Sequence, residues 1–307
     1  MGRGQYVRRR LLTLVPVWFG ATALTFLLIH SIPGGPFDTG QIRSAETTAS
    51  LNHIYHLDRS LPVQYAIYMW GVLHGDLGES MIQRGLTVSS VIADRFPTSA
   101  LLGLAALIVS LGVGIPAGLL SAVHKRRLPD YMLMSGATIG YAIPNFVLAI
   151  LLILLFSLTL GWLPAGGWGS FSELILPAIA LGLPWAGLIA RMTRAATLDT
   201  LHKDYVRTAR AKGASSSRVV MRHAFRNALL PLTTIIAIIT AEIITGSLVI
   251  ENIFGIPGLG HYVTDAVLGA DYTMTLGLVI FYSGLVFIAN FLVDLSYSLL
   301  DPTVSFG

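Results

Sequence analysis

Six long stretches of this sequence contain almost no Asp, Glu, Lys or Arg. A helix that crosses the hydrocarbon core of a bilayer needs about 20 predominantly apolar residues. Runs of this length and character therefore predict membrane-spanning helices. The six stretches are 11–32, 96–124, the part of 131–172 that precedes a break at 161–167, 174–190, 227–250 (interrupted only by Glu242) and 272–293.

The charge content supports this interpretation. Only 12% of the 307 residues are charged, whereas soluble domains carry about 25%. So few charges cannot cover a water-facing surface, which excludes a soluble enzyme, a disordered chain and a secreted scaffold. The chain has no cysteine, so disulfides, thiolate nucleophiles and cysteine metal ligands are excluded as well. We therefore predict an all-α, polytopic membrane protein with six transmembrane helices.

Most of the lysines and arginines gather in three regions, at 3–10, 125–127 and 191–226. All three lie on one side of the membrane if the first span starts inside, and cytoplasmic loops carry the excess of basic residues. The sequence thus predicts that both termini are cytoplasmic. The net charge of +4 reflects orientation in the lipid bilayer and does not indicate nucleic-acid binding. The predicted segments are a cytoplasmic N-terminus (1–10), a first span (11–32), a long outer loop (33–95), a core with five spans (96–300) that includes the cytoplasmic loop 191–226, and a cytoplasmic C-terminus (301–307).

The outer loop 33–95 is too long to be a simple connector. It contains apolar segments such as Tyr-Ala-Ile-Tyr-Met-Trp at 65–70. We therefore expect short helices in this loop, lying at the membrane surface.

No motif for energy conversion is recognisable in the chain. None of the lysines is followed by the Ser or Thr of a P-loop, and neither His-Glu-x-x-His nor Gly-x-Ser-x-Gly occurs. The chain is not expected to be an enzyme or to hold a cofactor or metal of its own. Any uphill transport would draw its energy from another polypeptide or from an ion gradient.

The basic loop 191–226 contains a segment with good helix formers at 201–212. Leu201, Tyr205 and Ala209 fall on one face at a spacing of four residues. Gly213 suits a helix C-cap with positive φ, and the serines at 215–217 are N-cap candidates for a second helix. Small residues in this segment would let the backbone of another protein come close; they are Thr208, Ala209, Ala211 and Gly213.

The same segment resembles the EAA-type loop of ABC importer permeases. Arg207-Thr208-Ala209 stands at the Glu-Ala-Ala positions, and Gly213 lies four residues after the second alanine position. Arginine replaces the glutamate, and Pro231 lies a few residues later than in the general pattern. Both departures are features of the peptide-transport branch of the family.

Further motifs extend the resemblance to nearly the whole chain and to the B-type permease subunit of oligopeptide and dipeptide importers. They are Arg-Arg-Leu at 9–11, Ile-Pro-Gly-Gly-Pro-Phe at 32–37, Tyr-His-Leu-Asp at 55–58, His-Gly-Asp-Leu-Gly at 74–78, Trp-Leu-Pro-Ala-Gly-Gly-Trp at 162–168, Gly-Ser-Leu-Val-Ile-Glu at 246–251, Phe-Gly-Ile-Pro-Gly-Leu-Gly at 254–260 and Asp-Pro at 301–302. Each is weak alone, but together, in this order and at these separations, they are specific.

The resemblance implies a type I importer permease fold in a bacterial cytoplasmic (inner) membrane. It implies a second homologous permease subunit, two cytoplasmic ATP-binding subunits that hold ATP and Mg, and an external substrate-binding protein. In this family a short coupling helix docks in a cleft of the ATPase. The corresponding residues of this chain are Tyr205, Arg207, Thr208, Ala209, Arg210, Ala211, Lys212 and Gly213.

Several residues are candidates for the transport pathway or its gate. A carboxylate inside a span costs several kcal/mol unless it is protonated, paired or facing water, so Glu242 either lines the pathway or makes a buried hydrogen bond. For Glu251, we favour a cap or a brace of its own loop over substrate contact. Pro144 bends the third span, and a structural role is favoured for Asn145. The Gly- and Pro-rich segment after the fifth span suggests either a re-entrant outer gate or a flexible loop, and its candidates are Phe254, Pro257 and Gly258.

Two other functions stay open. Related permeases carry dipeptides, glutathione or nickel, and only the motif at 162–168 favours oligopeptides. A self-contained secondary transporter would need a dense set of intramembrane ionisable groups or an inverted repeat, and we find one glutamate and no repeat.

Overall fold

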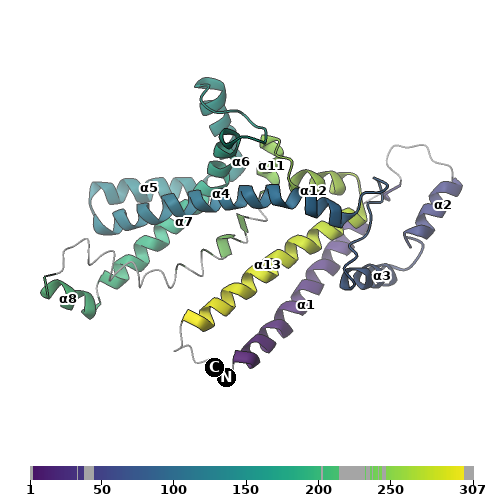
Figure 1. Cartoon of the computed structure of the whole chain (residues 1–307), viewed down its shortest axis with the longest axis horizontal. Coiled ribbons are helices and arrows are strands. Elements are labelled where there is room, and N and C mark those ends of the chain that lie inside the picture. The colour runs from purple at the N-terminus through teal and green to yellow at the C-terminus, as the bar shows by residue number, and fades with distance from the viewer. Residues whose placement is uncertain are drawn as a thin grey trace. The chain divides into compact units, whose positions relative to one another are not determined.

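The computed structural model describes residues 3–32, 34–37, 45–201, 203–213 and 247–300, and single positions between 232 and 243. Within these ranges the chain is helical apart from turns and one isolated antiparallel bridge between Glu79 and Thr87, which confirms the all-α prediction. The elements in chain order are α1 (Arg3–His30), α2 (Ala45–Ile54), α3 (Leu61–Leu73), α4 (Val88–Val123), α5 (Leu128–Ala142), α6 (Asn145–Leu152), the π-helix η1 (Ile153–Thr159), α7 (Phe171–Leu201), α8 (Asp204–Ala211), α11 (Leu248–Phe254), α12 (Leu259–Leu268) and α13 (Tyr272–Leu300) (Figure 1).

Four of the described helices are long and apolar enough to cross a membrane by themselves. They contain Leu12–His30, Val88–Val123, Phe171–Leu201 and Tyr272–Phe291. A fifth candidate is the pair Leu128–Ala142 and Asn145–Thr159, whose halves meet at 105°. These five correspond to the first, second, fourth, sixth and third predicted stretches. The other stretch, 227–250, lies largely outside the described residues, so the count of six and the orientation stay predictions.

The 105° bend is centred on Ile143 and Pro144. A residue that precedes proline is pushed out of the α region by the proline ring. Ile143 accordingly has φ −78° and ψ 124°. The predicted proline bend is thus confirmed, and it divides the third stretch into two short helices.

Two helices continue past the ends of their predicted spans. α4 begins at Val88, inside the predicted outer loop, and the Thr87 Oγ1 atom caps it by accepting from the Ser90 N–H at 3.2 Å. α7 continues beyond Arg191 to Leu201, inside the predicted cytoplasmic loop. Charged residues end an apolar stretch, but they are good helix formers and do not end a helix.

The chain divides into two compact units, and the division passes through α4. The first unit comprises 1–99, 257–288 and 306–307, and the second comprises 100–256 and 289–305. In the second unit α7 packs against α5, α6 and α11. Its buried core includes side chains from α4, α6, α7 and α11; examples are Leu102, Ala149, Leu181, Ile189 and Phe254.

Glycines bring α4 and α7 close together in the second unit. A Cβ atom on Gly114 would lie 2.7 Å from the Ala186 carbonyl oxygen, and one on Gly118 would lie 2.4 Å from the Ala190 carbonyl oxygen. The buried Ser110 hydroxyl donates to the Gly182 carbonyl at 2.8 Å. Small residues at the contact are typical of helix pairs in membranes.

In the first unit, α3 packs against α1. The Tyr65 hydroxyl lies 2.8 Å from Thr22 Oγ1 and donates to the Phe19 carbonyl at 3.1 Å. The helices α2 and α3 confirm the expectation of short helices within 33–95, and their place at the membrane surface stays a prediction.

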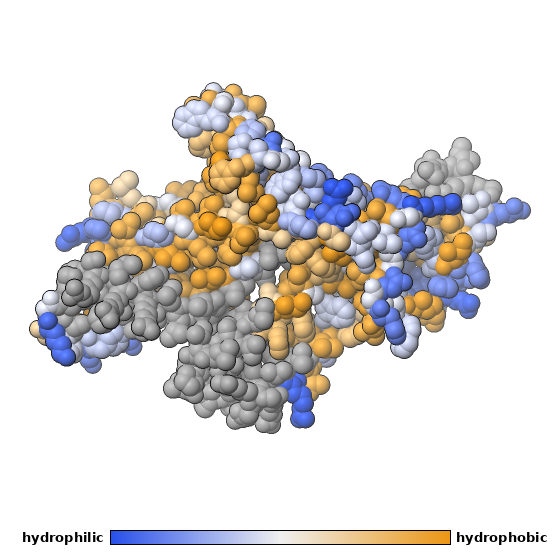
Figure 2. All heavy atoms as spheres, in the orientation of Figure 1, coloured by the Kyte–Doolittle hydropathy of each residue, from blue (hydrophilic) through white to orange (hydrophobic). Residues whose placement is uncertain are grey.

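Many large apolar side chains of the long helices are exposed. On α4, Leu104 and Ile108 are 54% and 63% exposed, and on α1, Leu24 and Leu28 are 58% and 61% exposed. Figure 2 shows apolar residues over much of the visible face of the described helices, with the strongly hydrophilic ones confined to a few places such as α8. Exposed apolar surface on this scale indicates contact with lipid or with other membrane subunits.

Candidate functional site

The predicted coupling segment forms a short helix directly after α7. Lys203 N–H donates to the Thr200 carbonyl at 3.1 Å, and α8 then runs from Asp204 to Ala211. Asp204 lies in the first turn, where a negative charge interacts favourably with the helix dipole. The helix expected within 201–212 is confirmed over most of its length.

Gly213 ends this segment with φ +83°, and a Cβ atom on it would meet nothing within 4 Å. The prediction of a positive φ at this glycine is confirmed, and the glycine is required by backbone conformation and not by lack of space.

One side of α8 is available to a partner. Tyr205, Thr208, Ala211 and Lys212 are exposed, whereas Val206 is fully buried. Sequence reasoning missed Val206, because the spacing of four residues that it followed includes Tyr205 and Ala209 but not Val206. The side chains of Arg207, Ala209 and Arg210 lie outside the described part of the structure, as do the predicted second helix from 215–217 and Pro231.

Glu251 is held by its own helix. It lies in the first turn of α11 with no exposed surface, and its Oε1 atom accepts from the Ser247 hydroxyl at 2.6 Å. The Ile256 N–H donates to the Glu251 carbonyl at 2.9 Å, and Gly255 ends α11 with φ +64°. This geometry agrees with a bracing role for Glu251.

The structure brings together two motifs that sequence reasoning treated separately. The Gly167 N–H donates to the Phe254 carbonyl at 2.9 Å. A Cβ atom on Gly166 would lie 2.4 Å from the same oxygen. The loop 162–168 is therefore bonded to the end of α11, and Phe254 itself is 1% exposed.

The other pathway candidates occupy different surroundings. Asn145 is half-buried and begins α6, which packs against α11. Glu242 is exposed on this chain. Pro257 is exposed, and Gly258 is buried at the N-cap of α12, next to a bond from the Leu259 N–H to the Ser99 hydroxyl at 3.0 Å.

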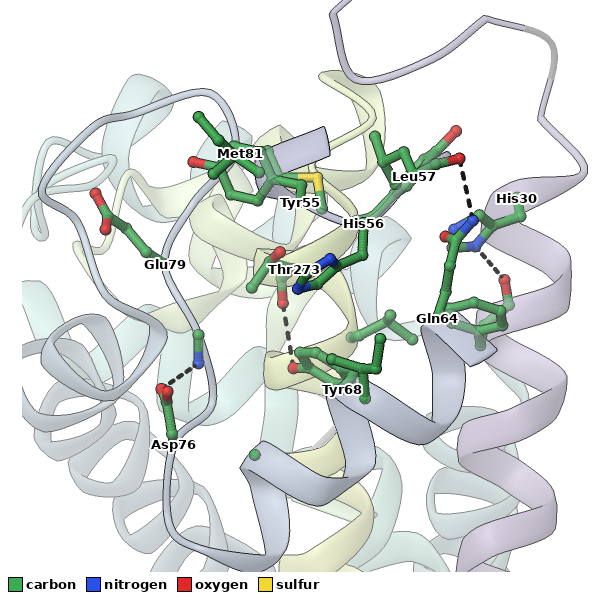
Figure 3. Close-up of a pocket in the computed structure, with 17 residues that line it drawn as sticks. His30, Tyr55, His56, Leu57, Gln64, Tyr68, Asp76, Glu79, Met81 and Thr273 are labelled. Atoms are coloured by element: carbon green, nitrogen blue, oxygen red, sulfur yellow. Dashed lines mark hydrogen bonds between the residues drawn. The ribbon is translucent and has the colours of Figure 1, made fainter. Parts of the chain in front are cut away.

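The first unit contains an open cavity of about 310 Å³ that sequence reasoning did not predict (Figure 3). It lies between the end of α1, the turn after α2, α3, the segment 76–81 and the start of α13. Carboxylates, histidines, phenols and aromatic rings line it, and none of its lining residues is Lys or Arg; those labelled in Figure 3 are His30, Tyr55, His56, Leu57, Gln64, Tyr68, Asp76, Glu79, Met81 and Thr273.

Tyr68 joins two walls of this cavity. Its hydroxyl donates to the Leu77 carbonyl at 3.1 Å and lies 3.5 Å from the Thr273 carbonyl. Burial, helped by the carboxylates of Asp76 and Asp271, raises the pKa of Tyr68 above its ordinary value. The phenol is therefore a hydrogen-bond donor at any physiological pH.

Among the residues that the structure describes, no group of three His, Asp or Glu could hold a metal ion.

The sequence profile of a family described as binding-protein-dependent transport system inner membrane component matches residues 114–306. The chain is 38% identical over 304 residues to the oligopeptide transport system permease protein OppB of Haemophilus influenzae, covering 98% of this chain and 99% of that protein. It is 38% identical over 300 residues to the dipeptide transport system permease protein DppB of Bacillus subtilis, covering 98% and 97%. It is 37% identical over 303 residues to the glutathione transport system permease protein GsiC of Escherichia coli O6:H1, covering 98% and 99%.

Among solved structures, a chain of the MetNI methionine ABC transporter in an inward-facing conformation aligns with a TM-score of 0.58 and 20% identity, covering 69% of this chain and 96% of that chain. This likeness shows a type I importer permease fold. Together with the family profile, which spans more than half of the residues, it places the protein: the chain belongs to the binding-protein-dependent transport system inner membrane components and is a multi-pass permease subunit of an ABC importer.

Proposed function

We propose that this permease subunit imports peptides. The observation that carries the proposal is the near full-length similarity to an oligopeptide and a dipeptide permease. The oligopeptide and dipeptide relatives are equally similar, and the glutathione relative is almost as close. The Trp-Leu-Pro-Ala-Gly-Gly-Trp motif at 162–168 is our reason to favour oligopeptides.

An importer permease works with ATPase and substrate-binding components. We propose that this chain pairs with a second, homologous permease in a bacterial cytoplasmic membrane. Two cytoplasmic subunits would bind ATP and Mg, and an external binding protein would deliver the peptide.

We propose that α8 is the coupling helix. Its exposed Thr208 and Ala211 are small, and its position after the long helix α7 suits a part that receives movement from an ATPase and passes it on. Closure of the ATPase pair would then displace a packed helix as a rigid body.

We propose an outer gate around the end of α11. The bond between Gly167 and Phe254 supports it, because irregular backbone at membrane depth is tolerated where it is buried in protein. Phe254, Pro257 and Gly258 would shape the gate, and Glu251 would brace it. Asn145 and Glu242 are the candidates along the pathway.

The first experiment tests the assembly. The tagged chain is purified from its native membrane in mild detergent, and the co-purifying proteins are identified by mass spectrometry. We expect a second permease and P-loop ATPases, and we expect ATP-dependent uptake of a labelled peptide in proteoliposomes only when the external binding protein is added. Folded chain that moves solute alone would refute the proposal and favour a secondary transporter, with Glu242 as the first ion-coupling candidate.

The second experiment tests α8. Ala211→Trp places a large side chain on its exposed surface, and Ala21→Trp, at an exposed position on α1, is the matched control. We expect Ala211→Trp to abolish most peptide uptake with the chain still in the membrane, and Ala21→Trp to leave uptake unchanged. Unchanged uptake by both variants would show that α8 does not contact the ATPase.

A further inference from the structure

An ion pair between a buried carboxylate and a partly exposed guanidinium ties α7 to the turn between α4 and α5. The Asp130 carboxylate is in the first turn of α5 and is 3% exposed. Arg194 of α7 donates to it through Nε at 2.7 Å and through Nη2 at 2.8 Å. This bidentate contact fixes both the distance and the angle between the guanidinium and the carboxylate, which the single ammonium of a lysine could not do.

The remaining acceptor capacity of Asp130 is used by the neighbouring turn. The buried Ser121 hydroxyl near the end of α4 donates to Oδ1, and the Arg126 N–H donates to Oδ2 at 2.8 Å. Arg126 has φ +62°, a conformation that a residue with a side chain rarely adopts. The carboxylate thus holds a strained turn and one helix at the same time.

The position of this pair along α7 suggests more than local packing. Arg194 is about two helical turns before the end of α7 at Leu201, and α8 begins at Asp204. Asp130 lies in the first turn of α5, which ends at the bend before α6. α6 packs against α11, and the last carbonyl of α11, that of Phe254, accepts a hydrogen bond from the Gly167 N–H in the loop 162–168. All of these elements belong to the second compact unit.

We propose that the Asp130–Arg194 pair is the joint through which movement of α8 reaches the α4–α5 turn and the bend before α6. Both are positioning residues, and neither needs to contact the peptide. The inference rests on the proposed coupling role of α8. A bidentate pair with a buried carboxylate suits this task, because Arg194 cannot shift alone without leaving the buried Asp130 charge uncompensated.

The functional test uses the assembled importer in proteoliposomes and measures ATP hydrolysis and peptide uptake in parallel. Arg194→Lys keeps the charge and loses the fork, and Arg191→Lys, at an exposed position on the same helix, is the matched control. We expect Arg194→Lys to hydrolyse ATP while the peptide imported per ATP falls about fivefold or more, the lower end of typical coupling effects. Arg191→Lys is expected to match the wild type.

A double-mutant cycle separates the joint from simple packing. Asp130→Asn and Arg194→Lys should each reduce the peptide imported per ATP, and the double variant should be no worse than the poorer single variant. Wild-type coupling in the assembled Arg194→Lys importer, or additive losses in the cycle, would overturn the proposal.

A distance measurement keeps the test decisive if these variants fail to assemble. Spin labels on Lys203→Cys and Lys125→Cys report on both sides of the joint, and both positions are exposed in a chain without cysteine. We expect one unchanged distance between the labels with and without ATP in the complete importer, while each label moves relative to the ATPase. A distance that changes with ATP refutes the joint. A constant distance together with normal uptake by Ala211→Trp refutes the coupling role of α8 and with it the transmission proposed here, although the pair itself is rigid.

Discussion

Single glycines determine how closely α4 and α7 approach. Gly114 and Gly118 are spaced by one helical turn and face backbone carbonyls of α7 across gaps that no Cβ atom could enter. Gly112, on the same helix, faces open space. The sequence displays all three glycines alike, and only the packing distinguishes the two that are required.

We expect Gly118→Ala to destabilise the protein by about 1–3 kcal/mol, the usual cost of overpacking a tight contact. Gly112→Ala serves as the control and should be neutral or slightly stabilising, since alanine favours a helix. Thermal unfolding of the purified proteins in one detergent compares them. Equal midpoints for the two variants would show that α4 and α7 do not approach as closely as described.

Tyr68 gives a prediction about pH. Because its folded-state pKa is raised, the fold keeps its full contribution from the phenol below the ordinary tyrosine pKa of about 10. The contribution is lost as the pH rises from there through the folded-state pKa, since the unfolded chain ionises first. Ultraviolet titration at 295 nm should show a late-ionising tyrosine that is absent in Tyr68→Phe. Identical titration curves for the two proteins contradict the buried hydrogen bond.

At the scale of elements, a helix can continue beyond the end of its apolar, membrane-spanning stretch. α7 continues from an apolar span into the basic segment, and α8 follows after a short turn. The long helix therefore continues from the predicted membrane region into the predicted ATPase-facing segment. Gly213 then closes α8 in a left-handed conformation.

We expect Gly213→Pro to uncouple ATP hydrolysis from uptake, because proline fixes φ near −65° and cannot adopt the +83° found here. Gly213→Asn is the control, since asparagine tolerates positive φ better than other side chains. Parallel assays of ATP hydrolysis and peptide uptake in proteoliposomes should show lost coupling only for the proline variant. Intact coupling in Gly213→Pro would mean that the end of α8 does not matter for transmission.

At the scale of the whole molecule, orientation in the membrane organises the function. The proposed delivery of peptide from outside and the proposed docking of an ATPase inside require the segments 33–95 and 191–226 to lie on opposite faces. The charge distribution predicts this arrangement, because basic residues stay on the cytoplasmic side. The absence of cysteine in the natural sequence makes the prediction easy to test.

We expect Ser60→Cys to react with a membrane-impermeant maleimide in intact cells, and Lys203→Cys to react only after the membrane is permeabilised. Both positions are exposed on this chain, so accessibility to the reagent reports the side of the membrane. The unmodified chain supplies the blank. Labelling of Lys203→Cys in intact cells would reverse the predicted orientation.

Much of the architecture could be predicted from the sequence. Five of the six apolar stretches matched described helices, Pro144 bent the third one, and Gly213 took a positive φ. Helix ends at Val88 and Leu201 could not be predicted from hydropathy, because a helix continues into water while its apolar stretch does not. Val206 gave no pattern, and the motif matches at 162–168 and 254 gave no indication that the two segments are bonded.

The sequence by itself determined the membrane class, the apolar segments and the short helix near Gly213, because apolar length, charge placement and backbone preference are properties of neighbouring residues. Only the tertiary structure decided which distant residues meet. Arg194 donates hydrogen bonds to Asp130, 64 positions away in the sequence, and the Gly167 N–H donates to the Phe254 carbonyl. The cavity beside Tyr68 likewise forms from segments far apart in the chain. Such contacts depend on how the helices pack, and packing is set by many side chains together.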